Sequence, residues 1–271
     1  MRQVRIFVTN DDGYDQPGIQ HLVDRLVADH GDAVWVLAPL TEHSGASSAV
    51  GDLAHNNPVI REVDVPGVAA GQAWAIEGPP ALGMLVAHLG ALGGKPDLVV
   101  SGINPGANMG RAVYHSGTVG AALTARNRGT SGIAVSTLVS KTGEKPEHWT
   151  TAAELAAVAA AAMLDDPPAE PLALNINVPD VPLAEVKGAR LAEVAIDGGS
   201  ALLSSRLEPL GDGRHKVIVE YDQDRLDGDR DATDSKVVRA GYASLTWLGR
   251  LGHDGPGSDS VVQRIDQLVS P

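Results

Sequence analysis

Two adjacent carboxylates and an amide follow the first short apolar run of the chain. Residues 4–9 read VRIFVT, a pattern typical of a buried β-strand, and Asn10, Asp11 and Asp12 come directly after it. The same residue types are common in turns and helix caps, so the NDDG sequence alone does not indicate a function. Its position does, because ligands of parallel α/β sheets bind beyond the carboxyl ends of the strands.

Other polar side chains follow the next predicted strands and should lie at the same edge of the sheet. Ser44 comes shortly after a predicted strand at 33–38, and Asn104 lies in a Gly-rich loop that follows a predicted strand at 97–101. Carboxylate, amide and hydroxyl oxygens are hard ligands, which suit Mg²⁺, Mn²⁺ or Ca²⁺ better than zinc or copper. The sequence therefore predicts a divalent-cation site at this edge.

A predicted anion site lies beside it. Ser116, Gly117 and Thr118 would begin a predicted helix at 119–128, where free backbone N–H groups, two hydroxyls and the helix dipole favour negative charge. A helix N-cap is an equally simple interpretation of Ser116. A cation next to an anion site indicates phosphate chemistry.

The elements that would hold these residues alternate between strand and helix. Pro17 and Gly31 suit the start and end of a helix with one apolar face, and together with the strands at 4–9 and 33–38 it forms a βαβ unit. Further strands are expected at 59–65, 72–76, 97–101, 132–137 and 172–178, with helices at 81–92, 119–128 and 148–164. This order predicts an α/β fold with a doubly wound, mostly parallel sheet.

The pattern changes after about residue 187. Extended segments are expected at 189–196, 215–221 and 237–248, and a terminal helix at 258–269. We therefore predict an α/β core over residues 1–187 and a β-rich C-terminal extension over residues 188–271.

Composition narrows the classes of partner. The formal net charge of −13 disfavours a surface for nucleic-acid phosphates, and the absence of cysteine removes thiolate catalysis and Cys-based zinc sites. The sequence contains no apolar run of ~18 residues, so no membrane span is expected, and we expect a cytoplasmic protein.

Two phosphate-chemistry families with acids after a first strand fit poorly. Haloacid dehalogenases need Asp-x-Asp, but Asn10 stands two residues before Asp12 and Gly13 two residues after Asp11. Receiver domains need a further Asp at the end of a third strand, and no residue near position 52 has such a context.

Together the motifs resemble the SurE family of stationary-phase survival proteins, which are metal-dependent 5′/3′-nucleotidases. The shared motifs occur in family order from residue 4 to about 247: TNDDG followed by PGI, AP with SG five residues on, PDLVVSGIN-GANMG, HSGTVGAA, LNINVP, and TD…GYASLT. Each motif is modest by itself, but the ordered set is specific.

The resemblance implies a concrete site. One divalent cation per subunit, Mg²⁺ or Mn²⁺, would be held by the side chains of four residues, and Asn10 with Ser116, Gly117 and Thr118 would face the phosphate of a nucleoside monophosphate. The four implied ligands are Asp11, Asp12, Ser44 and Asn104. Asp11 or Asp12 would also accept the proton of the attacking water. The resemblance further implies a Rossmann-like fold and a homodimer or homotetramer assembled through the C-terminal extension.

The chain departs from the family pattern at three places. Leu40 and Thr41 replace an Asp-Arg pair, residues 78–84 read GPPALGM where TPADCV is frequent, and Ser47-Ser48-Ala49 replaces a Ser-His-Ser-like stretch. The first two departures favour one alternative, a nucleotide- or metal-binding protein with little turnover. A more remote alternative is a nucleotide-sugar transferase, since such enzymes also use acids with a metal at a strand end.

Overall fold

A computed structural model describes residues 4–53, 55, 57–139, 145–195, 202–221 and 232–249. The predicted terminal helix at 258–269 lies outside the described residues.

Nine of the described strands form one sheet in the order β3–β4–β2–β1–β5–β6–β7–β11–β8. They are β1 (Ile6–Thr9), β2 (Val34–Pro39), β3 (Ile60–Glu62), β4 (Ala73–Ile76), β5 (Leu98–Pro105), β6 (Ser131–Thr137), β7 (Ala173–Val178), β8 (Ala189–Leu191) and β11 (Ala243–Leu248). The six central strands from β4 to β7 are parallel, whereas β3 and β11 run antiparallel to β4 and β7. The predicted doubly wound, mostly parallel α/β sheet is therefore confirmed.

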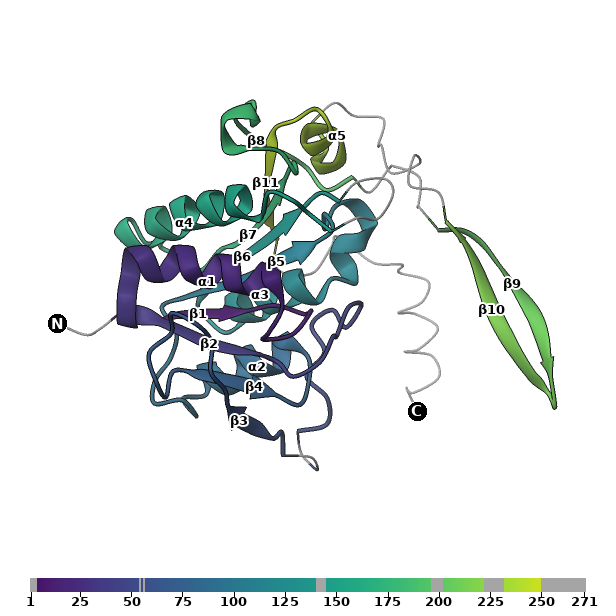
Figure 1. Ribbon diagram of the computed structural model, residues 1–271, viewed down its shortest axis with the longest axis horizontal. Helices are drawn as coiled ribbons and strands as arrows, with labels where there is room; N and C mark the ends of the chain where they lie inside the picture. The colour runs from purple at the N-terminus through teal and green to yellow at the C-terminus, as the bar shows by residue number, and fades with distance from the viewer. Residues whose placement is uncertain are drawn as a thin grey trace, which may run out of the picture.

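Helices cover both faces of the sheet. On one face α1 (Pro17–His30) and α4 (Trp149–Asp165) lie side by side (Figure 1) and bury a core with Val8, Val100 and Ile176. On the other face α2 (Pro80–His88) and α3 (Gly117–Asn127) pack over Phe7 and Val99. None of the described helices is long and apolar enough to cross a membrane.

The chain reverses its direction of sheet growth between β1 and β5. From β1 it adds β2 and β4 on one side, and it then returns to add β5, β6 and β7 on the other. This reversal makes the carboxyl ends of β1 and β5 the topological switch point, which is where ligands of such sheets bind. Asp11 and Asn104 come from these two strand ends.

The part after residue 187 differs from the sequence prediction. Residues 237–239, the start of the segment predicted as extended at 237–248, belong to the helix α5 (Asp234–Arg239), in which the adjacent apolar residues Val237 and Val238 are buried. The strand predicted at 189–196 is β8 alone. Because β8 and β11 extend the main sheet, the boundary predicted at 187/188 does not separate two sheets.

The strand β9 (Leu202–Gly211), which the sequence analysis missed, pairs with β10 (Arg214–Tyr221) in a second, two-stranded sheet. These two strands project away from the nine-stranded sheet as a long arm (Figure 1). The described part of the chain also contains three short 3₁₀ turns, η1 (Gly31–Ala33), η2 (Gly110–Tyr114) and η3 (Leu183–Glu185).

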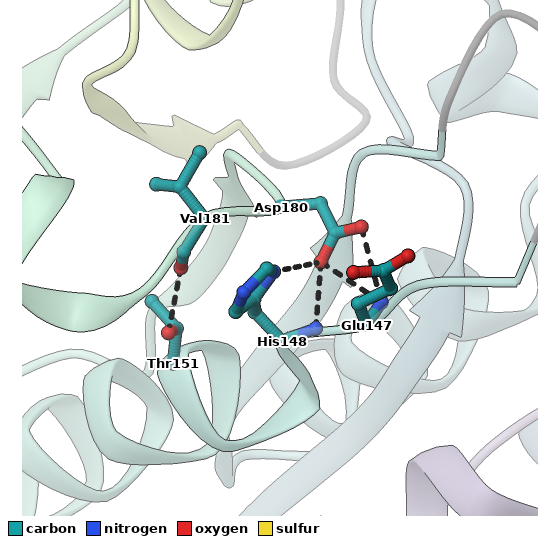
Figure 2. Close-up of polar contacts among 5 residues, drawn as sticks. All are labelled: Glu147, His148, Thr151, Asp180 and Val181. Atoms are coloured by element: carbon teal, nitrogen blue, oxygen red, sulfur yellow. Dashed lines mark hydrogen bonds and ion pairs between the residues drawn. The ribbon is translucent and has the colours of Figure 1, made fainter.

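The start of α4 is held by a carboxylate from a distant part of the chain. Asp180, which follows β7, accepts hydrogen bonds from the backbone N–H groups of Glu147 and His148, and its Oδ1 lies 3.3 Å from Nδ1 of the His148 ring (Figure 2). Thr151 donates its hydroxyl to the Val181 carbonyl at 2.8 Å. Asp180 thus supplies the cap that His148, the N-cap residue, does not provide.

We expect Asp180→Ala to lower the free energy of unfolding by about 1–2 kcal/mol, because two backbone N–H groups at the start of α4 lose their acceptor. Asp166→Ala is the matched control, since Asp166 is an exposed carboxylate at the other end of the same helix. Urea unfolding would measure both. Equal stability of the two variants would contradict the capping role.

Candidate functional site

The turn after β1 is closed by Asn10. This residue is fully buried; its side-chain N–H donates to the Gly13 carbonyl at 2.8 Å, and its Oδ1 accepts from the Gly13 N–H at 3.3 Å. The amide therefore fixes the turn that carries Asp11 and Asp12. The contact of Asn10 with phosphate that the resemblance implies stays a prediction.

Asp11 packs against the first turn of α3. The Thr118 hydroxyl donates to its Oδ1, and a Cβ added at Gly117 would lie 2.8 Å from both the Cβ and the Oδ2 of Asp11. Because atoms cannot approach so closely, position 117 must be glycine for the helix to begin here. The structure thus joins the predicted cation site to the predicted anion site.

The loop after β2 lies across both of these elements. The His43 N–H donates to the Asp11 carbonyl at 2.7 Å, and the Ser47 N–H donates to the His115 carbonyl at 3.1 Å. Gly120 on α3 leaves room for this loop, since an added Cβ would lie 2.1 Å from the Ser47 carbonyl oxygen. Ser44 occupies the exposed turn between these anchor points.

Asn104 is the second-last residue of β5. The pairing of β5 with β6 shifts between Ser101 and Asn104, an irregularity of the kind that re-aims side chains at the rim of a sheet. The Asn104 side-chain N–H donates to the Gly106 carbonyl, so its Oδ1 remains as an oxygen ligand.

Ser116 is the N-cap of α3, as the simpler sequence interpretation suggested. Its Oγ accepts the Val119 N–H at 3.1 Å. In this structure Ser116 therefore caps the helix and Thr118 contacts Asp11. Contacts of Ser116, Gly117 and Thr118 with a phosphate stay predictions.

Burial dominates the electrostatics of the two acids. It raises the pKa of Asp11, against hydrogen bonds from the Thr118 hydroxyl and from backbone N–H groups that lower it. Burial also raises the pKa of Asp12 to about 7, and the negative charges of Asp11 and Glu42 add to this rise. Among the described residues, neither carboxylate forms an ion pair with a basic side chain.

The donor set has few strong ligands. In the described ranges no group of three or more His, Asp or Glu side chains gathers as a metal site. The ligand set that the resemblance implies, in which the Ser44 hydroxyl and the Asn104 amide oxygen complete the two carboxylates, stays a prediction. A hard cation next to two unpaired carboxylates would relieve their mutual repulsion.

A buried polar network that the sequence analysis did not identify lies beneath the loop after β5. The Asn108 carbonyl accepts from the side-chain N–H groups of Asn175 at 2.8 Å and Asn177 at 3.1 Å, and the Asn108 side chain donates to the Ser136 hydroxyl. Two asparagines within a fully buried strand are unusual. The two asparagines in the otherwise apolar segment LNINV are the sequence feature that could have indicated this buried network.

A cavity of about 350 Å³ lies at the opposite edge of the sheet, where β5 and β6 begin. Its lining includes His88, Lys95 and Arg128, and none of the predicted site residues. The candidate site is therefore at the carboxyl edge of the sheet, between the ends of β1 and β5, rather than in this cavity.

Comparison with known proteins supports the resemblance. A family model described as "Survival protein SurE" matches residues 6–198. The chain is 37% identical over 245 residues to a protein of Xanthomonas campestris pv. campestris (strain B100) named "5'-nucleotidase SurE", covering 90% of this chain and 88% of that protein. It is 35% identical over 241 residues to a protein of the same name from Symbiobacterium thermophilum, covering 89% and 90%.

A solved structure has the same fold. The crystal structure of the SurE protein from Aquifex aeolicus aligns with a TM-score of 0.72 and 26% identity, covering 97% of this chain and 99% of that one. The alignment therefore spans nearly the whole of both chains.

The raised pKa values predict an unusual pH dependence. Between about pH 4 and pH 7 the folded protein keeps protons that the unfolded chain has released, so stability without added metal falls as pH rises through this window. At pH 8 in EDTA, Asp12→Asn should raise the free energy of unfolding by about 1–3 kcal/mol, discounted because the carboxylate stays partly exposed.

Asp15→Asn is the control, because Asp15 is an exposed carboxylate in the same loop. Thermal melts of both variants from pH 4 to pH 8 would test the prediction. An Asp12→Asn variant no more stable than Asp15→Asn at pH 8 would contradict it.

Proposed function

The chain belongs to the SurE family, and on that premise we propose that it hydrolyses nucleoside monophosphates to nucleoside and phosphate as a 5′-nucleotidase. The observation that carries the proposal is the contact between Asp11 and the start of α3 at the carboxyl ends of β1 and β5. It brings two unpaired carboxylates next to a helix N-terminus, which suits a cation together with a phosphate.

The residues present fit a divalent cation. Asp11, Asp12, the Ser44 hydroxyl and the Asn104 Oδ1 would hold one Mg²⁺ or Mn²⁺, and the pKa of about 7 at Asp12 is consistent with carboxylates that need a positive partner. When bound, such an ion would supply positive charge beside the phosphoryl oxygens and make water easier to deprotonate.

The protein's own groups would stabilise the developing charge and accept the proton. The N-terminus of α3, with the N–H groups of Gly117 and Thr118, is suited to stabilise negative charge that develops on the phosphoryl oxygens. Asp11 or Asp12 would accept the proton of the attacking water. With no cysteine, and no Asp-x-Asp after the first strand, we propose direct attack by water rather than a phosphoenzyme.

The alternative of a binding protein with little turnover rested on two departures from the family pattern. One of them, residues 80–84, forms the first turns of α2, where Ala81, Leu82 and Met84 are buried in the hydrophobic core. Leu40 and Thr41 follow β2 and are the departures nearer to the site. We propose that they affect the preference for the base or ribose rather than the hydrolysis itself.

We also propose that the arm mediates self-association. One face of the β9–β10 hairpin carries Leu207, Val217 and Val219, which are 64%, 59% and 50% exposed, and the other face pairs Glu208 with Lys216. A two-stranded hairpin alone is marginally stable in water, so we propose that its exposed apolar face packs against another protein surface. The occupant that we propose is a second copy of the chain, in a homodimer or homotetramer.

Activity can be tested with a chromogenic phosphomonoester and with nucleoside monophosphates, in Mn²⁺ and in EDTA. Asp12→Asn should lower metal-dependent phosphate release by at least about 10²-fold, since a cation site of this kind contributes several kcal/mol to the transition state. Asp15→Asn should keep wild-type activity. Phosphate release that EDTA does not change would contradict the metal requirement, and no release from any nucleotide would favour the binding protein.

Self-association can be tested by sedimentation velocity. Val217→Glu places a charge on the apolar face of the arm and should weaken association at least about tenfold, whereas Lys216→Ser on the opposite face should change it little. If both variants sediment as the wild type does, the arm is not the interface.

A further inference from the structure

The connecting loop, residues 105–116, joins the two halves of the candidate site. It begins directly after Asn104 and ends at the N-cap of α3, so its conformation sets where that helix begins relative to β5. Such a loop must be held in place if the distance between cation and phosphate groups is to stay fixed.

Three anchors hold the first part of the connecting loop, residues 106–110, whereas the Ser47 N–H described above holds its end at the His115 carbonyl. The Gly106 N–H donates to the Thr137 carbonyl of β6 at 2.9 Å, and Asn108 is bonded to β6 and β7 through the buried network described above. The third anchor comes from 124 residues farther along the chain, where Oδ2 of Asp234 accepts the Gly110 N–H at 2.9 Å.

Asp234 also closes the root of the arm. Its Oδ1 accepts the N–H groups of Ala195 at 3.1 Å and Ser235 at 2.8 Å, and its own N–H donates to the Glu193 carbonyl at 2.8 Å. The Glu193 N–H in turn donates to the Ala232 carbonyl at 2.9 Å. Residues 193–195 and 232–234, which flank β9 and β10 in the sequence, therefore lie side by side.

The chemistry of this contact requires a carboxylate. Asp234 is fully buried and, among the described residues, pairs with no basic side chain, so its charge is balanced by backbone N–H groups alone. Burying a carboxylate is costly, and an asparagine could accept at only one of the two positions. Gly110 also packs closely, since an added Cβ would lie 3.0 Å from the Ala195 carbonyl oxygen.

We propose that Asp234 is a positioning residue for hydrolysis: it ties the connecting loop to the root of the arm and so fixes the start of α3 against Asp11. This inference rests on the function proposed above. It follows that the site depends on a closed arm root, although no residue of the arm itself need touch the substrate.

Asp234→Asn is the sharpest variant. With its oxygen toward Ala195 and Ser235, the new amide presents an N–H to the N–H of Gly110, so the bond to the connecting loop is lost selectively. Gly110→Ala perturbs the same contact from the side of the connecting loop, and it replaces Asp234→Asn in the test if that variant does not fold. Asp212→Asn is the matched control, because Asp212 lies exposed at the tip of the arm with φ +51°, which asparagine tolerates.

Two measurements would be made on each variant at a temperature where circular dichroism shows it fully folded. Hydrogen exchange of peptides within residues 105–116 should accelerate about tenfold or more in Asp234→Asn and in Gly110→Ala. The kcat/KM for a phosphomonoester with Mn²⁺ should fall at least about tenfold, while the Kd for Mn²⁺ measured by calorimetry should change less than about threefold. Asp212→Asn should change neither exchange nor activity.

Faster exchange with unchanged kcat/KM would overturn the positioning role, and unchanged exchange would overturn the anchor itself. If the wild-type chain releases no phosphate, the proposed function fails, but the exchange result still decides whether Asp234 holds the connecting loop. A fall in kcat/KM matched by an equal fall in Mn²⁺ affinity would also contradict the proposal, because Asp11 and Asp12 lie in the turn after β1 and Asn104 lies in β5, all outside the loop.

Discussion

The close approach of α3 to Asp11 is the constraint on which the site depends. A helix can begin so near a carboxylate only if its first residue has no side chain, which Gly117 satisfies, and only if that carboxylate is given donors, which Thr118 provides. The loop after β2 then covers the junction by packing on Gly120. The result is a pair of acids that the protein partly removes from water and leaves without a basic partner.

This arrangement exchanges stability for binding capacity. Two like charges with raised pKa values weaken the folded state above neutral pH, and the same charges would provide the binding energy of the cation that we propose. Stability of the rest of the molecule comes from ordinary sources: two apolar layers between the sheet and its helices, and caps such as Asp180 at the start of α4. The site can therefore be costly without endangering the fold.

Sequence patterns predicted the parts of the molecule that local rules govern. Pro17 and Gly31 bound α1 as expected, and the apolar runs gave the parallel strands in order, because burial on both faces makes such strands continuous apolar segments. The end of α5 at residues 237–239 was included in a predicted strand because the apolar run VV stands close before β11, and β9 was missed because its described side chains are exposed and show no buried alternation. Asp234 could not be assigned a role from sequence, since its partners Gly110 and Ala195 are brought to it only by the tertiary fold.

The contact at Asp234 also separates the β9–β10 hairpin from the sheet edge. Residues 193–195 and 232–234 lie side by side, so the chain leaves the main sheet and returns to it at one place. A change in the length of the hairpin would leave these two segments where they are, and with them the sheet edge that carries Asp11 and Asn104. Asp234 lies at this border, because it is bonded to Ala195 on one side and to Gly110 of the connecting loop on the other.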